Sequence, residues 1–197
     1  MRFLTVFTLL IASILPIEAN NKRKLNMPDW AFCVAYVLRD ADQREQRPNP
    51  PSSDDPFSGD SETWIPNNIL RRGHIVDVAS LISRTTAQKI LDKETTARFI
   101  GAISEQTKKN LVMDCYDPHH IFVFYDHYGK PVSAIEICLT CGRVKMLPSQ
   151  SVRHDNLYGT DLELIAEILD SIKLSLHPFE SLKSFKQQNK EIQMHRK

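Results

Sequence analysis

The sequence lacks an excess of either charge, an internal repeat and any apolar run long enough to cross a membrane comfortably. Its 25 basic residues nearly balance its 24 acidic ones, so charge gives no reason to expect a nucleic acid or an acidic membrane as partner. Neither the Gly-x-Ser-x-Gly nor the His-Glu-x-x-His pattern of hydrolases occurs. These absences argue against nucleic-acid-binding proteins, membrane-spanning proteins and the common motif-bearing hydrolases.

The first nineteen residues predict an export signal. Arg2 precedes an almost wholly apolar stretch over residues 3–15, which has the length of a signal-peptide core. Pro16 ends this stretch, and Ala19 offers a small residue at a cleavage site. We therefore expect a soluble mature chain from residue 20 onward, in the periplasm or outside the cell. A buried N-terminal helix is the alternative.

The composition divides the rest of the chain into four parts. Residues 20–42 contain a continuous apolar run that favours a buried helix over about 28–40, with a buried strand as the alternative. Residues 43–68 are rich in Pro, Ser and Asp, which predicts a long loop because so little apolar surface is available for burial. Residues 69–176 form the predicted α+β domain. Residues 177–197 form a polar, basic tail that we expect to be solvated.

A β-hairpin is the strongest structural signal in the α+β part. Residues 121–125 and 132–138 are both strand-like, and Gly129 between them suits a turn with a positive φ. The flanking sequence predicts a strand over 74–82, a helix over 84–93, a partly helical stretch over 95–111, a strand over 143–147 and a helix over 161–176 with Thr160 and Glu163 as its capping box. The expected fold is a small antiparallel sheet with this hairpin at its centre, packed by a few helices.

Three of the four cysteines lie around this hairpin. If the hairpin turns about its midpoint, Cys115 lies opposite Cys141, and His120 lies opposite Glu136 on the face that also carries Cys138. A slip of one residue would turn these side chains to the other face. The sequence therefore predicts a Cys/His cluster at the open end of the hairpin.

Three kinds of chemistry fit this cluster, and none assigns a catalytic residue. In an exported chain the first expectation is a disulfide that joins Cys115 to Cys138 or Cys141. The alternative metal site would hold zinc with these three thiolates and His120, and Glu136 would orient the imidazole. Thiol redox chemistry at the Cys138-x-x-Cys141 pair is the third interpretation. The disulfide is favoured because export exposes thiols to oxidation, and it requires no cofactor.

Cys33 lies apart from the hairpin, within the apolar run of residues 30–38. One interpretation is a buried thiol that packs as a small hydrophobic side chain. The other is a second disulfide, formed with whichever hairpin cysteine remains.

Three short motifs of the hairpin region form one pattern: C-x-x-P-x-H, then F-Y-D-x-x-G-K-P, then I-E-I-C-x-x-C. The matching positions are Cys115, Pro118 and His120, residues 124–126 and 129–131, and residues 135–138 with Cys141. The pattern resembles a stretch that recurs in uncharacterised, often exported bacterial proteins. The resemblance implies that His120, rather than His119, is the histidine of the pattern, and it names no activity. Leu139 departs from it, because such proteins often carry phenylalanine there.

These observations predict an exported, non-enzymatic binding or interaction domain with a structural Cys/His cluster. A protein in the cell envelope is the kind of partner that the expected compartment suggests. The competing hypothesis is a zinc-binding or thiol-redox protein that uses Cys115, His120, Cys138 and Cys141.

Overall fold

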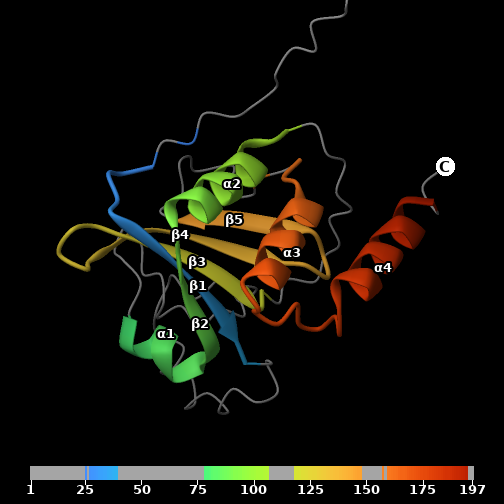
Figure 1. Cartoon of the computed structure of the whole chain (residues 1–197), viewed down its shortest axis with the longest axis horizontal. Coiled ribbons are helices and arrows are strands. Elements are labelled where there is room, and N and C mark those ends of the chain that lie inside the picture. Colours follow the sequence, from blue (N-terminus) through green and yellow to red (C-terminus); the bar gives the residue numbers. More distant parts are fainter. Residues whose placement is uncertain are drawn as a thin grey trace, which may run out of the picture.

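The computed structural model describes residues 25, 27–39, 78–106, 118–147, 157 and 159–194. These residues form a five-stranded antiparallel sheet with helices packed around it, which confirms the predicted α+β fold (Figure 1). The elements in chain order are β1 (Phe32–Leu38), α1 (Val78–Arg84), β2 (Thr85–Leu91), α2 (Lys93–Ser104), β3 (His120–Tyr125), β4 (Pro131–Cys138), β5 (Arg143–Leu147), α3 (Leu162–Ser171) and α4 (Leu182–Met194). The predicted export signal, the predicted loop over 43–68 and Cys115 lie outside the described residues.

The strand order is β2-β1-β3-β4-β5, and every neighbouring pair is antiparallel. Strands β3 and β4 form the predicted hairpin, and β5 confirms the strand expected over 143–147. Gly129 in the hairpin turn has a φ of 74°, as expected for a glycine that permits the left-handed conformation.

Strand β1 is interior to the sheet, and this explains its unbroken apolar sequence. It pairs with β2 on one side and β3 on the other, and its residues from Cys33 to Leu38 are all buried. Hydrophobic periodicity cannot distinguish a short buried strand from a buried helix. The helix predicted over 28–40 is therefore wrong, and the alternative of a buried strand is confirmed.

The segment before α2 has the opposite order of elements from the one expected. Residues 78–84 form helix α1 where a strand was predicted, and residues 85–91 form strand β2 where a helix was predicted. Leu81 of α1 is fully buried against the sheet, and β2 pairs along most of its length with β1. Pairing and burial with distant parts of the chain overrode the local preferences of these short segments.

Helix α3 confirms most of the helix predicted over 161–176, but its cap differs. Asp161 is the N-cap, and its carboxylate accepts a hydrogen bond from the main-chain nitrogen of Leu164 at 3.1 Å. The hydroxyl of Thr160 instead donates to the main-chain oxygen of Leu157, so the predicted capping box does not form. The helix ends at Ser171, two residues before Lys173, which has a φ of 62°.

Helix α4 covers residues 182–194 of the segment expected to be a solvated tail, and one of its side chains packs into the protein. Phe185 is only 2% exposed, and its ring meets that of Phe179 edge to face at 5.2 Å. Lys186 also pairs with Glu167 of α3 at 2.6 Å. The helix lies beside α3 and away from the sheet (Figure 1). Within the described ranges, no helix combines the length and the apolar character that a membrane span needs.

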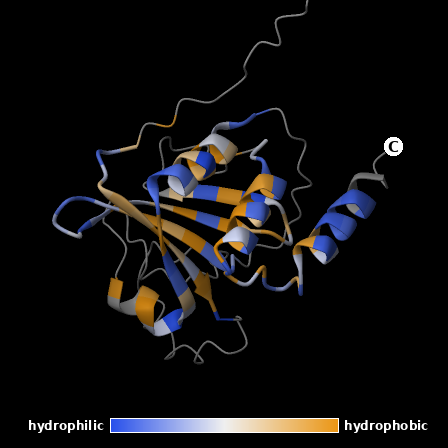
Figure 2. Cartoon of the chain, in the orientation of Figure 1, coloured by the Kyte–Doolittle hydropathy of each residue, from blue (hydrophilic) through white to orange (hydrophobic). Residues whose placement is uncertain are grey.

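The sheet buries a separate core on each of its faces, because successive side chains of a strand point to opposite sides. We call one side the α2/α3 face; Phe122 and Ile135 pack there with residues of α2 and α3. We call the other the tyrosine face; Tyr36 and Tyr125 lie there with Leu81 of α1. Figure 2 shows the hydrophobic colours concentrated on the strands and on parts of the helices, whereas α4 is mostly hydrophilic.

Candidate functional site

The β3–β4 hairpin carries most of the predicted site residues, but its register differs by one residue from the expected one. His120 pairs with Ile137, and Glu136 pairs with Ile121. His120 therefore points to the α2/α3 face. Glu136 and Cys138 alternate in β4 with residues that point to that face, so their own side chains point to the tyrosine face. The prediction that these three side chains share one face was wrong.

A β-bulge next to the hairpin turn causes this difference. Tyr125 pairs with Pro131, whereas the preceding Phe124 pairs with Ser133. Val132 is thus an extra residue in β4, and everything beyond it is displaced by one position. Pro131 has no main-chain N–H to contribute to regular pairing at this point.

His120 is fully buried on the α2/α3 face, and one of its ring nitrogens forms a hydrogen bond with the main chain. Its Nε2 donates to the main-chain oxygen of Ser175 at 2.7 Å. A carbonyl oxygen only accepts, so the neutral ring carries its proton on Nε2 and a lone pair on Nδ1. Among the residues that the structure describes, Nδ1 has no hydrogen-bond partner.

Burial also keeps this imidazole neutral, because it lowers the pKa of His120 to about 4. The hydrogen bond to Ser175 opposes this shift, and the charges of His119 and His177 add to it. The ring centroids of His119 and His177 lie 4.4 Å apart. Together with His120, these histidines lie where β3 contacts the connection between α3 and α4.

This contact holds the α3–α4 connection against the end of β3. Ser175 lies between Leu174 and Leu176, both of which are buried. Sequence analysis missed Ser175, because it is 55 residues from His120 and contributes a main-chain oxygen, which leaves no signal in a motif.

Cys138 and Cys141 are both buried in the core cluster of the tyrosine face. Cys138 ends β4, and Cys141 lies in the short turn to β5. The nitrogen of Gly142 donates to the oxygen of Cys138 at 3.0 Å, and Gly142 has a φ of 72°. The turn therefore fixes the two cysteine side chains on the same side of the sheet. Cys115 lies outside the described residues, so its predicted pairing with either one stays a prediction.

Glu136 is a buried carboxylate on the tyrosine face, with only 2% of its surface exposed. In the sheet it is paired with Lys145 of β5, and the neighbouring pair joins Cys138 to Arg143. Two basic residues of β5 thus occupy the positions beside Glu136 and Cys138. Opposite charges at paired positions offset the cost of burying a carboxylate.

A pair of tyrosines completes the polar groups of this face. The hydroxyl groups of Tyr36 and Tyr125 form a buried hydrogen bond of 2.7 Å. Burial raises the pKa of both phenols, so both remain protonated at neutral pH. Sequence analysis missed this pair, because the two residues share a face only once β1 and β3 are known to be neighbours.

Cys33 is a free thiol, fully buried on the α2/α3 face. Burial raises the pKa of this thiol, which keeps it in the unreactive protonated form. The interpretation of Cys33 as a small buried hydrophobic residue is confirmed. Cys33 is bonded to neither Cys138 nor Cys141, which lie in the core of the opposite face, and its alternative pairing with Cys115 stays a prediction because Cys115 lies outside the described residues.

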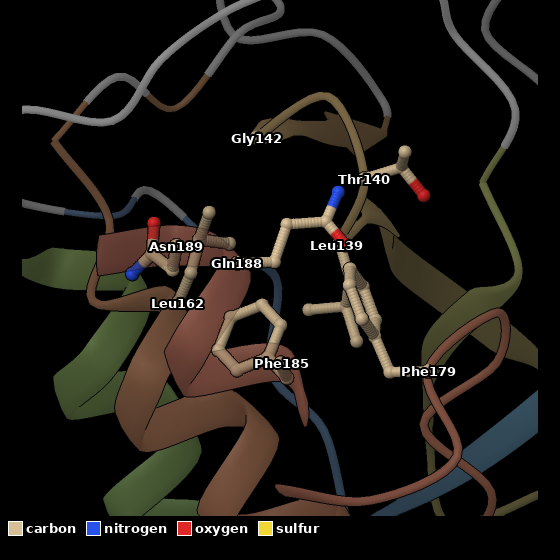
Figure 3. A pocket seen from close by; sticks show the side chains of 8 residues that line it. All are labelled: Leu139, Thr140, Gly142, Leu162, Phe179, Phe185, Gln188 and Asn189. Carbon is tan, nitrogen blue, oxygen red and sulfur yellow. The ribbon is translucent and has the colours of Figure 1, made fainter. Parts of the chain in front are cut away.

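A shallow recess lies between the β4–β5 turn and α4, with a volume of about 330 Å³ that includes open solvent (Figure 3). Its lining consists of Leu139, Thr140, Gly142, Leu162, Phe179, Phe185, Gln188 and Asn189. None of these side chains is an acid or a base near neutral pH. The recess therefore offers an apolar floor with amide and hydroxyl groups, and no group suited to proton transfer.

The candidate site thus divides into a histidine contact on one face of the sheet and a Cys/Glu/Tyr group on the other. Within the described part of the chain, no three His, Cys, Asp or Glu side chains are placed to hold a metal ion. No family model, curated protein or solved structure matches this chain.

Proposed function

We propose that this protein is an exported, non-enzymatic interaction domain in which the cysteines and His120 stabilise the fold. The observation that carries this proposal is the division of the predicted cluster by the sheet. His120 lies on the α2/α3 face, whereas Cys138 and Cys141 lie in the core of the tyrosine face. A Cys–His nucleophile pair needs the imidazole within hydrogen-bond reach of the thiol, and the sheet separates these thiols from this imidazole.

The state of His120 gives further support. A general acid or base works best with a pKa near the operating pH and with access to its substrate. His120 is fully buried, its Nε2 is bonded to Ser175, and its pKa is lowered to about 4. These properties suit a group that fastens two segments together.

The compartment and the cysteine chemistry belong to the same proposal. We place the protein in the periplasm or outside the cell on the basis of residues 1–19. In that oxidising environment we propose a disulfide between Cys115 and either Cys138 or Cys141. Both candidate partners are buried beside the same turn, so either sulfur would be held in a fixed position for a bridge to Cys115.

Zinc is the second candidate, and the Cys138-x-x-Cys141 turn favours it. Two thiolates at this spacing make a common zinc half-site, and both side chains are buried on one face. His120 lies on the other face, so three of the four predicted ligands remain for such a site. A closed tetrahedral site would then need a ligand outside the predicted set.

Metal analysis and a thiol count on the exported, purified protein distinguish these two candidates. We expect no stoichiometric zinc, one disulfide, and two thiols that react with a thiol reagent only after denaturation, one of them Cys33. Peptide mapping without reduction would identify the bridge. About one zinc per chain with all four thiols reduced would overturn the disulfide and support the zinc alternative.

A further inference from the structure

Strand β2 forms one edge of the sheet and is exposed on both of its faces. It pairs with β1 on its inner side, and in the described part of the chain no strand pairs with its outer side. The side chains of Thr86, Gln88, Lys89 and Ile90 are exposed. A strand of this kind presents a row of main-chain donors and acceptors that can pair with another strand.

Exposed isoleucines lie at both ends of this strand. Three large hydrophobic residues of the described chain are exposed, and two of them are Ile82 and Ile90, at 56% and 68%. Ile82 belongs to α1, which leads directly into β2, and Ile90 is the last but one residue of β2. Ile90 pairs with Val34, and both Val34 and α1 belong to the tyrosine face. Two exposed apolar groups thus flank one edge strand on the same side of the sheet.

We propose that a second copy of this chain pairs with β2, antiparallel and about a two-fold axis at Gln88. Gln88 is the midpoint of β2 (Thr85–Leu91), so this register uses the whole strand. Thr86 then lies opposite Ile90 of the second copy, and Ala87 lies opposite Lys89. Cross-strand pairs of β-branched residues are favourable, and the two lysines do not face each other.

The neighbouring symmetric registers fit less well. A two-fold axis at Lys89 would place two ammonium groups directly opposite each other, which is destabilising. An axis at Ala87 would place Ile90 opposite Arg84, which belongs to α1 and not to the strand. The sequence of β2 therefore selects Gln88 as the centre.

The two-fold symmetry also accounts for the exposed isoleucines. An axis perpendicular to the sheet keeps the tyrosine faces of both copies on the same side. Ile90 of each copy then lies toward the end of α1 of the other copy, where Ile82 is exposed. The pairing joins two sheets into one and covers apolar groups that are otherwise in solvent. A second copy is thus the partner that we assign to the interaction domain proposed above, and this assignment rests on that proposal.

Sedimentation analysis over a wide concentration range tests the dimer. We expect the purified protein to be dimeric and the Ile90→Asp variant to be monomeric with an unchanged circular dichroism spectrum. Tyr128→Asp is the matched control, because Tyr128 is the third exposed large hydrophobic residue, at 95%, and lies in the hairpin turn away from β2. A wild-type protein that is monomeric throughout would overturn the inference, as would a dimer that tolerates Ile90→Asp.

A cross-link tests the register. In the Gln88→Cys variant the two introduced thiols face each other across the axis, at a Cα separation of about 4.5–5.5 Å, which suits a disulfide. Oxidation should yield a covalent dimer. In the Thr86→Cys control the two introduced thiols are four residues apart along the strands, roughly 13 Å, and no covalent dimer should form. Equal cross-linking of both variants would overturn the register. The zinc and thiol measurements on the same protein are independent, so a monomer without zinc would overturn only the choice of partner.

Discussion

The two faces of the sheet bury different kinds of side chain. The α2/α3 face holds the larger core cluster, in which the rings of Phe99 and Phe122 stack with their centroids 3.7 Å apart. The tyrosine face holds a smaller cluster with the Tyr36–Tyr125 hydrogen bond, two cysteines and the buried Glu136 nearby. Stacked aromatic and aliphatic side chains predominate on the α2/α3 face, whereas the tyrosine face also buries a hydrogen-bonded tyrosine pair, two thiols and a carboxylate.

His120 is one of the polar side chains buried on the mainly apolar α2/α3 face. It is a buried polar residue within an apolar core, and its bonded nitrogen is satisfied by the main-chain oxygen of Ser175. This hydrogen bond links the strand to the connection between α3 and α4. The aromatic stack, the cysteines of the tyrosine face and His120 can each be tested by substitution.

The largest effect is expected from truncating the aromatic stack on the α2/α3 face. Phe122→Ala should lower the free energy of unfolding by about 3–5 kcal/mol, because it removes a fully buried ring and leaves a cavity against Phe99. Val123→Ala is the matched variant on the tyrosine face, since Val123 is the next residue of β3 and is equally buried. Urea denaturation would measure both. A larger loss of unfolding free energy in Val123→Ala than in Phe122→Ala would contradict the greater stabilisation that we assign to the α2/α3 core.

An intermediate effect is expected from the cysteines of the tyrosine face. Replacing the bridged member of the pair, Cys138 or Cys141, by alanine should cost about 2–5 kcal/mol under oxidising conditions, because the cross-link is lost. Cys33→Ala is the control, because it removes the same atoms from the buried free thiol of the other face. Thermal melting with and without a reductant would separate the contribution of the disulfide to stability from the contribution of side-chain packing. Melting curves that are identical for all three variants in both conditions would contradict a structural role for the pair.

The smallest effect is expected from pH, through His120. The folded pKa of about 4 lies below the usual value of 6.5, so the unfolded chain binds more protons between these two values. The contribution to stability is present above pH 6.5 and falls as the pH is lowered toward 4. His120→Gln should flatten this part of the stability profile, because an amide can still donate to Ser175 but does not titrate.

His119→Gln serves as the control for the pH profile, because His119 is adjacent in sequence and also buried. This variant should keep most of the slope between pH 6.5 and 4, because burial is the largest cause of the lowered pKa of His120 and the charge of His119 only adds to it. If His119→Gln removed the slope and His120→Gln kept it, the buried titrating group would have been assigned to the wrong histidine.

The parts of the fold that the sequence predicted correctly have strong local signals. The hairpin has two β-rich runs and Gly129 at its turn, and α3 has apolar residues on one helical face. The parts predicted wrongly depend on distant neighbours. The apolar sequence of β1 fits a buried helix as well as a buried strand, and only its pairing with β2 and β3 decides between them. The sequence of β2 has no strong local preference for a strand.

The features of the candidate site also differ in whether they depend on nearby or on distant residues. Cys138 and Cys141 are three residues apart in the chain, and the turn between them places both side chains in the core of the tyrosine face. The sequence placed His120 on the wrong face, because the single extra residue Val132 in β4 shifts the register by one. Ser175 was not foreseeable, since a main-chain oxygen can be contributed by any residue.

The sequence by itself determined the α+β class and the central hairpin, because both depend on patterns among residues close together in the chain. Only the tertiary structure decided that His120 and the cysteines lie on opposite faces of the sheet. The physical reason is the two-residue period of a strand, by which one bulged residue reverses the side of every side chain beyond it.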